Sequence, residues 1–362
     1  MKVAYITRGE FGVIGGAASY MLPTLLSKDH EVIVLSPVDA SGKEKIVFNN
    51  HELNILNLTG ESPEEIVSEA NVYLQGFQPD VVHIFQNPLC LHYLSTLPAM
   101  LKQSRWVLDF RSPLLAKNKK TRKRILNRYF LSQFYVDHIF THSLLTLQEN
   151  IKYRFRKASE LTFGVELDKY SVKENLAAEP TKYIYIGSVS VARQVGTLVK
   201  SFCEYVRETN SNKTLDLFGD GDDLASLRRY ARENNFDCIK FHGAIPQHLL
   251  IRRLSEYDVG IAYVTQDKYS SAPSLKSAEY AASGLPILAS DTAGHRDWAK
   301  RYGFSYGFFD NTVNDIKRTL AETGNREEVR KQVANNLDAI RRFDWHRVVN
   351  EDLLPVYSRL IN

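Results

Sequence analysis

The sequence predicts an α/β protein made of two doubly wound, parallel-sheet domains. Short β-branched runs alternate with longer amphipathic segments over most of the 362 residues, which is the pattern of repeated strand–helix–strand units. The alternation stops near residues 165–180 and then restarts. A chain of this length exceeds one ordinary core. Because ligands bind at the carboxyl ends of parallel strands, we expect a ligand cleft between the two domains.

The first domain is expected to span residues 1–168. Its apolar runs are bounded by turn residues, as buried parallel strands are. Five strands are predicted: KVAYIT, EVIVLSP, DVVHIF, RWVLDF and DHIFTHS, at 2–7, 31–37, 80–85, 105–110 and 137–143. Helices are predicted between them, for example at 18–28 and 62–77, and Ser62 is a suitable N-cap for the second of these.

The second domain is expected to span residues 180–343. Five strands are predicted there: YIYIGS, TLDLFG, IKFHG, DVGIAYV and LPILAS, at 183–188, 214–219, 239–243, 258–264 and 285–290. Helical segments alternate with them at 198–208, 222–234 and 247–257. Residues 344–362 carry apolar side chains at helical spacing, with Pro355 as an expected kink. No strand follows them, so we expect this helix to cross back to the first domain.

The composition excludes several classes of protein. Apolar residues make up 44% and charged residues 24%, which is typical of soluble globular proteins. A formal charge of +4 is too small to imply a nucleic-acid partner. The cysteines (Cys90, Cys203 and Cys238) lack CxxC spacing, which predicts buried thiols and no zinc site. No signal peptide and no run of ~20 apolar residues is found, so a cytoplasmic location is expected.

A glycine loop, GEFGVIGGAASY, follows the first predicted strand. Nucleotide-binding folds place a phosphate-binding turn at this position. The loop does not match GxGxxG, and Ser36-Pro37 stands where a ribose-binding acidic residue would end the second strand, which disfavours a dinucleotide oxidoreductase. Gly15 and Gly16 either form a plain tight turn or allow the backbone to contact a sugar or phosphate.

Three carboxylates, Asp220, Asp222 and Asp223, lie in FGDGDDLASL at 218–227. The segment lacks the following glycine and glutamate of a calcium-binding loop. Asp222 or Asp223 is better suited to cap the helix that follows. We therefore expect no metal site.

The segment SSAPSLKSAEYAASGLPILAS, residues 270–290, combines a helix start with two charged side chains. A helix beginning near Ser274 would present free N–H groups and a positive dipole end to an anion. Lys276 adds a cation, and Glu279, three residues later, supplies an acceptor suited to ribose hydroxyls. The alternative on spacing alone is a surface i, i+3 ion pair.

Part of this segment, PSLKSAEYAASGLPILAS, resembles the donor-nucleotide motif of the retaining glycosyltransferases of family 4, or glycosyl transferases group 1. Other segments follow in the order of that family: GGAASYMLPTLLSKDHEVIVLS, FGVELDKY, LFGDGDDLASLRRYA, IKFHGAIPQHLL and the closing DWHRVVNEDLLPVYSRL. The resemblance covers nearly the whole chain. It implies the GT-B fold, with two Rossmann-like domains, an acceptor-binding first domain and a nucleotide-sugar-binding second domain.

By this resemblance, Glu279 is expected to hold the ribose of a nucleotide sugar. The residues Ser274, Leu275 and Lys276 should then lie near its diphosphate. Family members often carry a second glutamate eight residues before the ribose-binding one, and Ser271 stands there. The resemblance therefore implies that the hydroxyls of Ser270 and Ser271, or backbone amides, contact the donor sugar.

The segment IGSVSVARQVG is similar to a family segment in which a glycine is followed by an arginine and, five residues later, a lysine. Ser188 occupies the arginine position and Arg193 the lysine position. One cation thus stands where the family often has two. We assign Gly187 and Gly219, at the ends of two predicted strands, to the same donor-nucleotide site.

The first domain contributes three further candidates at strand ends that should face the cleft. These are His83 in DVVHIF and Asp109 with Arg111 in VLDFRSP. Together with Arg193 and Lys276 they form the predicted catalytic set. The alternatives are a core imidazole for His83 and, for the other two, an internal ion pair that braces a loop.

A basic run, AKNKKTRKRILNRYFLSQFY, occupies residues 116–135. Basic residues beside apolar and aromatic ones at helical spacing are typical of a helix on a membrane surface. We expect it to dock on an anionic membrane. The alternative is a solvated helix whose apolar side joins the domain core. The basic residues are Lys117, Lys119, Lys120, Arg122, Lys123, Arg124 and Arg128.

Together with these residues, the resemblance implies a retaining glycosyltransferase of the hexosyltransferase type, expected in the cytoplasm or on the inner face of the cytoplasmic membrane. The expected donor is a nucleotide sugar, first of all a UDP-sugar, and the acceptor a glycan or lipid-linked sugar in surface polysaccharide or glycoconjugate synthesis. No cofactor or metal is expected, because Arg193, Lys276 and a helix N-terminus can stabilise the leaving diphosphate. The alternatives are a catalytically silent binding subunit, which Ser188 and Ser271 favour, and a nucleotide-sugar epimerase of the same fold.

Overall fold

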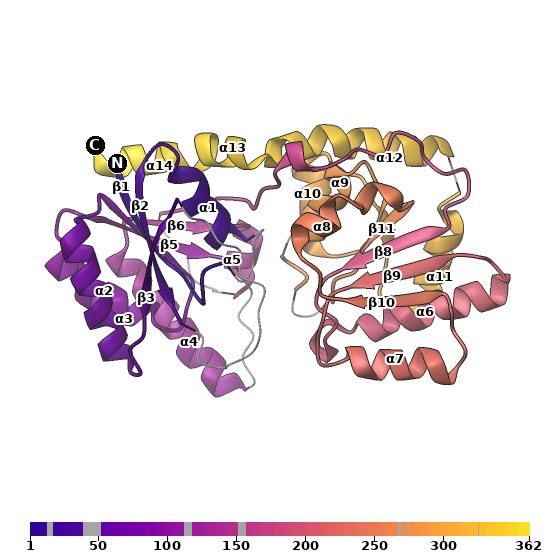
Figure 1. Cartoon of the computed structure of the whole chain (residues 1–362), viewed down its shortest axis with the longest axis horizontal. Helices are drawn as coiled ribbons and strands as arrows, with labels where there is room; N and C mark the ends of the chain where they lie inside the picture. Colours follow the sequence, from indigo (N-terminus) through magenta and orange to yellow (C-terminus); the bar gives the residue numbers. More distant parts are fainter. Residues whose placement is uncertain are drawn as a thin grey trace. The chain divides into compact units, whose positions relative to one another are not determined.

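The computed structural model describes residues 1–12, 17–38, 52–111, 118–150, 157–266, 269–272, 274–324 and 326–362. The chain forms two compact units. Unit 1 comprises Met1–Gly164 and Trp345–Asn362, and unit 2 comprises Val165–Asp344. Figure 1 traces the chain through both units. The chain therefore passes from one unit to the other twice.

Unit 1 is built on a seven-stranded sheet in which every neighbouring pair is parallel. The strand order is β3-β2-β1-β4-β5-β6-β7. The sequence did not predict β3 and β7, which are the two edge strands. The bounds are β1 (Lys2–Ile6), β2 (Glu31–Pro37), β3 (Asn54–Leu58), β4 (Val81–Phe85), β5 (Arg105–Phe110), β6 (His138–Thr141) and β7 (Ala158–Glu160).

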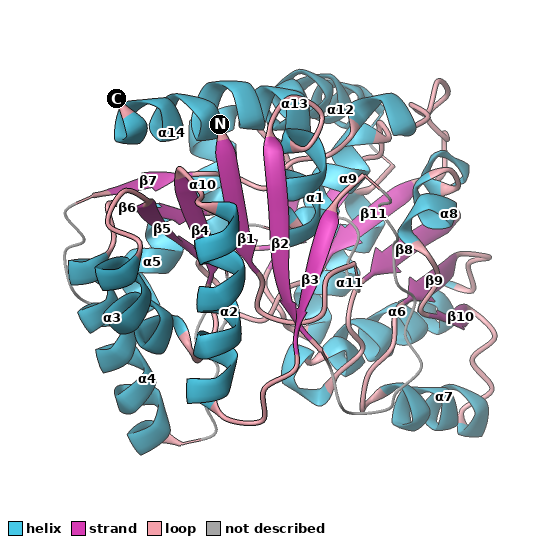
Figure 2. Ribbon diagram, turned by 60° about the vertical axis from the view of Figure 1, so that its left-hand side comes forward, coloured by secondary structure: helices cyan, strands magenta, loops and turns pink. Residues whose placement is uncertain are grey.

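Alternate residues of these strands enter two cores, one on each face of the sheet. Ala4 and Ile6 of β1 belong to the core with α2 (Pro63–Phe77), α3 (Cys90–Met100) and α4 (Lys119–Ser132). Val3 and Tyr5 of the same strand belong to the core with α1 (Ala18–Leu26) and the C-terminal segment. Figure 2 shows β1, β2 and β3 side by side with α2.

The predicted N-cap of α2 is confirmed. The Ser62 hydroxyl accepts a hydrogen bond from the Glu65 N–H, and the Glu65 carboxylate accepts one from the Ser62 N–H. This reciprocal pair satisfies two N–H groups that the helix itself cannot bond.

The C-terminal residues return to unit 1, as predicted. They form α13 (Trp345–Arg347), a π-helical turn (Val348–Leu353) and α14 (Leu354–Ile361). Their apolar side chains pack in the core with β1. A Cβ atom on Gly164 would lie 2.6 Å from the Trp345 ring, so the chain packs tightly where it re-enters the unit. Pro355 lies in the first turn of α14, and the irregular turn comes before it.

Unit 2 contains a six-stranded parallel sheet of order β10-β9-β8-β11-β12-β13. The order reverses between β8 and β11, which makes this pair the switch point of the sheet. The edge strand β13 was not predicted. The bounds are β8 (Lys182–Ile186), β9 (Thr214–Phe218), β10 (Ile239–Gly243), β11 (Val259–Ala262), β12 (Ile287–Ser290) and β13 (Gly307–Phe309).

Helices pack on both faces of this second sheet. One core contains residues of α6 (Val195–Thr209), α7 (Leu224–Glu233) and α11 (Val313–Glu322). Helix α9 (Leu275–Ala282) packs directly on β11, because a Cβ atom on Gly260 would lie 2.4 Å from the Tyr280 ring. The predicted class, two doubly wound parallel-sheet domains, is therefore confirmed.

None of the described helices is both long and apolar enough to cross a lipid bilayer. The three cysteines are buried free thiols, as the sequence predicted. Two of them, Cys203 and Cys238, have their sulfur atoms 3.8 Å apart in unit 2.

Candidate functional site

The candidate site of unit 2 lies at the carboxyl ends of β8 and β11. Lys276, in the first turn of α9, donates a hydrogen bond from Nζ to the carbonyl of Tyr263, just after β11, at 3.2 Å. The same Nζ lies 5.3 Å from the ring centroid of Tyr185, in β8. A single lysine thus contacts both strands of the switch point, where doubly wound sheets bind ligands.

Glu279 lies one turn further along α9 and is only 5% exposed. Its Oε1 accepts a hydrogen bond of 2.8 Å from Nε2 of Gln247, the first residue of α8 (Gln247–Ile251). Among the ion pairs between described residues, none joins Glu279 to Lys276. The alternative of a surface ion pair is therefore wrong, because the carboxylate is buried and bonded to an amide. Gln247 was not predicted from the sequence.

Both charged groups have strongly shifted pKa values. Burial raises the pKa of Glu279 to about 7, although the Gln247 hydrogen bond and the Lys276 charge act in the opposite direction. Burial lowers the pKa of Lys276 to about 7, the Arg193 charge lowers it further, and the Glu279 charge opposes this. Two groups that titrate near neutrality in one small region are typical of a binding or catalytic site.

No side chain caps the N-terminus of α9 among the described residues. Ser274 is the N-cap residue in extended conformation, but its side chain bonds none of the N–H groups of the first turn. Its hydroxyl oxygen is buried and has no protein partner. First-turn N–H groups without a cap, together with a buried polar atom lacking a partner, suit an anion with several acceptor oxygens.

Two predicted glycines, Gly187 and Gly219, shape the ends of β8 and β9. Their φ angles are +142° and +145°, values that side-chain-bearing residues rarely adopt. The Gly187 N–H donates to the carbonyl of Phe218 at 2.9 Å. A Cβ atom on Gly219 would lie 1.9 Å from the Gly187 carbonyl oxygen. Only glycine at position 219 permits this close approach of the two strand ends.

Arg193 and Ser188 follow β8. The Arg193 guanidinium lies 3.5 Å from the ring centroid of Tyr269, and its charge reaches Lys276 strongly enough to lower the pKa of that lysine. Ser188 is exposed, and its carbonyl accepts a hydrogen bond from the Tyr185 hydroxyl. The structure therefore brings Arg193 and Lys276 into one electrostatic site.

Ser270 and Ser271 lie before α9. The Ser270 carbonyl accepts a hydrogen bond of 2.6 Å from the N–H of Gly294, in the first turn of α10 (Ala293–Tyr302), while Ser271 is buried. A further hydroxyl, that of Thr265 after β11, is buried without a protein partner. Gly15 and Gly16 lie outside the described residues.

The aspartate cap predicted for α7 is correct in position but not in its hydrogen bond. Asp223 is the N-cap residue, but its side chain makes no capping bond. The Asp222 carboxylate instead accepts a hydrogen bond of 2.9 Å from the Val191 N–H, which ties this loop to the turn containing Arg193. The described residues contain no group of three or more side chains placed to ligate a metal.

Unit 1 holds the other three predicted residues in a buried network. His83 lies in the middle of β4 and not at the strand end, where its position in DVVHIF predicts it. Its Nε2 is 3.1 Å from Oδ2 of Asp109, and its Nδ1 is 2.6 Å from the hydroxyl of Tyr357, in α14. The Asp109 carboxylate also pairs with Nε of Arg111 at 2.7 Å. The Arg111 guanidinium donates to the carbonyl of Leu161 at 2.7 Å.

The electrostatics of this network agree with a structural role. Burial lowers the pKa of His83, and Asp109 only partly opposes this, which favours the neutral imidazole. Burial alone would raise the pKa of Asp109, but Arg111 and His83 more than offset it and the pKa is lowered. Both ring nitrogens of His83 are bonded to protein groups. This geometry agrees with the alternative interpretations, in which His83 is a core imidazole and Asp109 and Arg111 form an internal ion pair.

Comparison with known families and structures agrees with this architecture. Residues 180–320 match the model of the family glycosyl transferases group 1, which supports the resemblance drawn from the sequence. No curated protein sequence matches the chain. The matched residues include all of the candidate site in unit 2.

Several solved glycosyltransferase-type structures are similar along the whole chain. Sucrose-phosphate synthase from Thermosynechococcus elongatus is 14% identical, with a TM-score of 0.78 and 99% of each chain covered. The lipopolysaccharide outer core galactosyltransferase WaaB is 15% identical, with a TM-score of 0.67 and 98% and 100% covered. The HepE protein from Anabaena, in complex with UDP-glucose, is 12% identical, with a TM-score of 0.71 and 99% and 100% covered. The chain therefore has the GT-B fold.

Proposed function

We propose that this chain, whose residues 180–320 match the glycosyl transferases group 1 family, is a glycosyltransferase that takes its sugar from a nucleotide-sugar donor. The observation that carries the proposal is the placement of the half-buried Lys276 and the buried Glu279 at the switch point of unit 2, beside the uncapped first turn of α9. Glu279 accepts hydrogen bonds from the ribose hydroxyls, and Lys276 faces the diphosphate. A UDP-sugar is the first candidate, because HepE, which is similar in fold, has been solved with UDP-glucose.

The chemistry requires positive charge where the diphosphate leaves. When the bond from the anomeric carbon to the phosphate oxygen breaks, the electron pair stays on that oxygen. Lys276, Arg193 and the uncapped first turn of α9 supply the stabilising charge, and no metal is needed for this. We assign the acceptor, a glycan or lipid-linked sugar, to unit 1.

The configuration at the anomeric carbon is retained in this proposal. The acceptor oxygen forms its new bond on the face from which the diphosphate departs, and its proton passes to the leaving phosphate oxygen. No side-chain nucleophile is required. Because Ser271 cannot offer a carboxylate to the donor sugar, its hydroxyl and that of Thr265, both in buried residues, are the groups we assign to that task.

The decisive experiment measures melting temperature with UDP, GDP, ADP, CMP and their common sugar conjugates, in the presence of EDTA. A ligand that binds only the folded protein raises the melting temperature. We expect one nucleotide family to do so with wild type. In Glu279→Ala the affinity for that nucleotide should fall about 100-fold, because loss of a charged acceptor leaves ribose hydroxyls without partners.

Glu322→Ala is the matched control. Glu322 is an exposed carboxylate of unit 2, paired with Arg318, and its removal should leave the nucleotide shift unchanged. A shift that survives in Glu279→Ala would contradict the ribose assignment. If no nucleotide shifts wild type, the catalytically silent subunit becomes the better description. Isomerised nucleotide sugar without transfer would identify the epimerase.

The lowered pKa of Lys276 predicts that the protein takes up a proton when it binds a nucleotide. With a pKa of about 7, most of this lysine is neutral at pH 8 in the unliganded protein. A bound diphosphate favours the charged form and raises the pKa, so the complex takes up close to one proton. Calorimetric titration at pH 8 in buffers of different ionisation enthalpy measures this number.

The matched variant for this prediction is Lys276→Arg. Arginine keeps the positive charge but stays protonated at pH 8, so any remaining binding should occur without proton uptake. Equal uptake in wild type and Lys276→Arg would show that another group titrates. At pH 6, where Lys276 is already mostly charged, the wild-type uptake should largely disappear.

A further inference from the structure

Helix α4 (Lys119–Ser132) and the 3₁₀ turn Gln133–Tyr135 have an inner and an outer side. The helix starts at Asn118, whose side chain accepts a hydrogen bond from the Thr121 N–H. On the inner side, Tyr129 is buried in a core of unit 1, and Ile125 and Leu126 pack against that core. The apolar side of the helix thus joins the domain core, which agrees with the alternative given for this segment in the sequence. This leaves the outer side to be explained.

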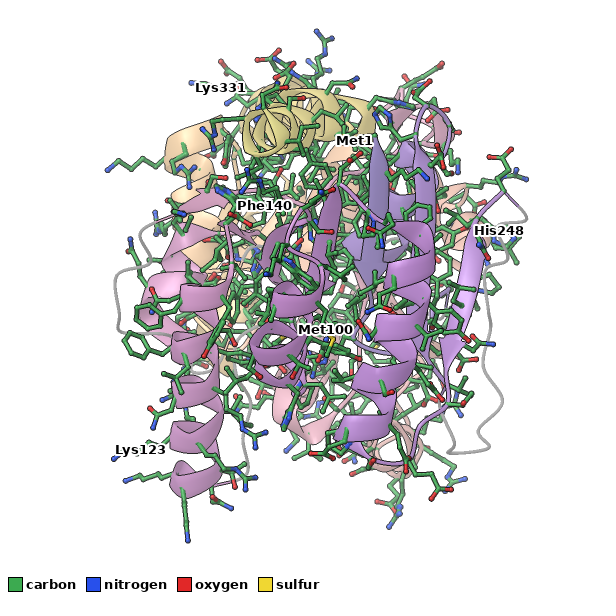
Figure 3. The ribbon with its side chains drawn as sticks, turned by 90° about the vertical axis from the view of Figure 1, so that its left-hand side faces the viewer. Met1, Met100, Lys123, Phe140, His248 and Lys331 are labelled. Carbon is green, nitrogen blue, oxygen red and sulfur yellow. The ribbon has the colours of Figure 1, made fainter. Side chains whose placement is uncertain are left out.

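The outer side of α4 begins with a concentration of positive charge. Five basic residues in its first two turns are exposed, and within the described parts of the chain none of them forms a salt bridge. No acidic residue occurs in the sequence from 112 to 136. Figure 3 shows Lys123 pointing away from the ribbon at one end of this helix. The five residues are Lys119, Lys120, Arg122, Lys123 and Arg124.

The same outer side ends in exposed apolar residues. Leu131, Phe134 and Tyr135 are 46%, 69% and 46% exposed. The spacing of Lys120, Arg124 and Leu131 (i, i+4, i+11) places them on one stripe of the helix, with Lys123 beside it. Phe134 and Tyr135 follow in the 3₁₀ turn that ends the helix. Basic groups are therefore continuous with an apolar end on a single surface, which we name the α4 surface.

We propose that the α4 surface docks the protein on a lipid bilayer that contains anionic phospholipids. The basic side chains attract the phosphate-bearing headgroups, and the side chains of Leu131 and Phe134 insert at the boundary between headgroups and acyl chains. Each basic residue near such a surface strengthens binding about fivefold. Several of them together with an apolar wedge give the two independent contributions that stable but reversible membrane docking requires.

A soluble polyanion is a less complete match for this surface. A nucleic acid or an acidic protein would be attracted by the same charges, but its binding would not depend on exposed aliphatic Leu131. Bilayer docking depends on both the charges and the apolar residues. This difference makes the proposal testable without donor or acceptor, so its outcome is separate from that of the glycosyltransferase assignment.

The experiment is flotation of the full-length protein with vesicles of phosphatidylcholine alone and of phosphatidylcholine with 25 to 30 mol % phosphatidylglycerol, as a probe composition. We expect binding to the anionic vesicles only, weakened by added salt. Lys120→Glu/Lys123→Glu should reduce the partition constant at least about 25-fold. Leu131→Ser/Phe134→Ser should reduce it about tenfold, because the apolar contribution is lost while the charge is kept.

Two control variants test whether vesicle binding depends on the α4 surface itself. The alternative is that any exposed charge or any exposed apolar side chain has the same effect. Arg229→Glu/Arg232→Glu reverses two exposed charges on α7, and Val72→Ser removes an exposed apolar residue on α2. Both should bind as wild type does. The melting temperature of each variant is compared with that of wild type. Because the substituted residues are exposed, the substitutions should leave the melting temperature nearly unchanged.

Three results would overturn the proposal. The first is no binding of wild type to anionic vesicles at low salt. The second is an equal loss of binding in the α7 variant. The third is binding that ignores the Leu131 and Phe134 substitutions and is matched by heparin or DNA, which would identify the α4 surface as a site for soluble polyanions.

Discussion

Gly219→Ala is expected to lower the free energy of unfolding of unit 2 by about 3 to 5 kcal/mol. The φ angle of +145° at Gly219 lies in a region that alanine rarely adopts. In addition, the new Cβ atom would lie 1.9 Å from the Gly187 carbonyl oxygen, which is a backbone atom and cannot rotate away. The ends of β8 and β9 would have to separate. Urea unfolding followed by circular dichroism measures the change.

Gly303→Ala is the control for this substitution. Gly303 also has positive φ, at +82°, but no heavy atom lies within 4 Å of the position its Cβ would take. We expect a cost of about 1 kcal/mol from the backbone conformation alone. If Gly219→Ala is no more destabilising than Gly303→Ala, the close approach of the two strand ends does not exist in solution. Because Gly187 borders the candidate site, Gly219→Ala should also reduce the nucleotide-induced melting shift.

The sequence predicted the central strands of both sheets and missed three at the edges. Central strands are buried on both faces, so they read as continuous apolar runs such as EVIVLSP. The missed strand β3 reads NILNL, and β7 and β13 are three residues long. Edge strands have one partner and partial exposure, so neither apolar continuity nor length marks them. The sequence signal for a parallel strand is therefore weaker at the sheet edges, although the edge strand β10, with the sequence IKFHG, was predicted.

The candidate site could be predicted where its residues share one helix or match the family resemblance, as Arg193 does. Lys276 and Glu279 share one helix, and their spacing together with the family resemblance identified both. Gln247 and Tyr263 reach them from α8 and from the end of β11, through an amide side chain and a main-chain carbonyl. Nothing in local spacing marks such contacts, because they depend on how separate elements pack. Burial of Glu279, which excludes the surface ion pair, likewise depends on tertiary packing.

The misplacement of His83 has a related physical origin. A polar residue near the end of an apolar run suggests a side chain at the sheet edge. In the structure His83 is fully buried in mid-strand, which is tolerated because Asp109 and Tyr357 bond both ring nitrogens. Tyr357 comes from α14, far along the chain. The sequence could not show that this partner exists.

Asp109→Ala is expected to lower the free energy of unfolding of unit 1 by about 3 to 5 kcal/mol. Asp109 is completely buried, and its carboxylate bonds both His83 and Arg111. Its removal leaves the Arg111 charge without its anion and His83 Nε2 without its partner, and each loss has a desolvation cost. Asp109→Asn should lose less, because the amide oxygen can still accept one hydrogen bond.

Glu351→Ala is the control within the same unit. Glu351 pairs with Arg347 at i, i+4 on the surface, with both side chains about half exposed, so its removal should change the free energy of unfolding by less than about 1 kcal/mol. A similarly small effect of Asp109→Ala would show that the buried network contributes little to stability. Tyr357→Phe tests the other end: it leaves His83 Nδ1 without a donor at an expected cost of about 1 to 3 kcal/mol. Because Tyr357 belongs to α14, a measured loss would also show that this network holds the C-terminal helix on unit 1.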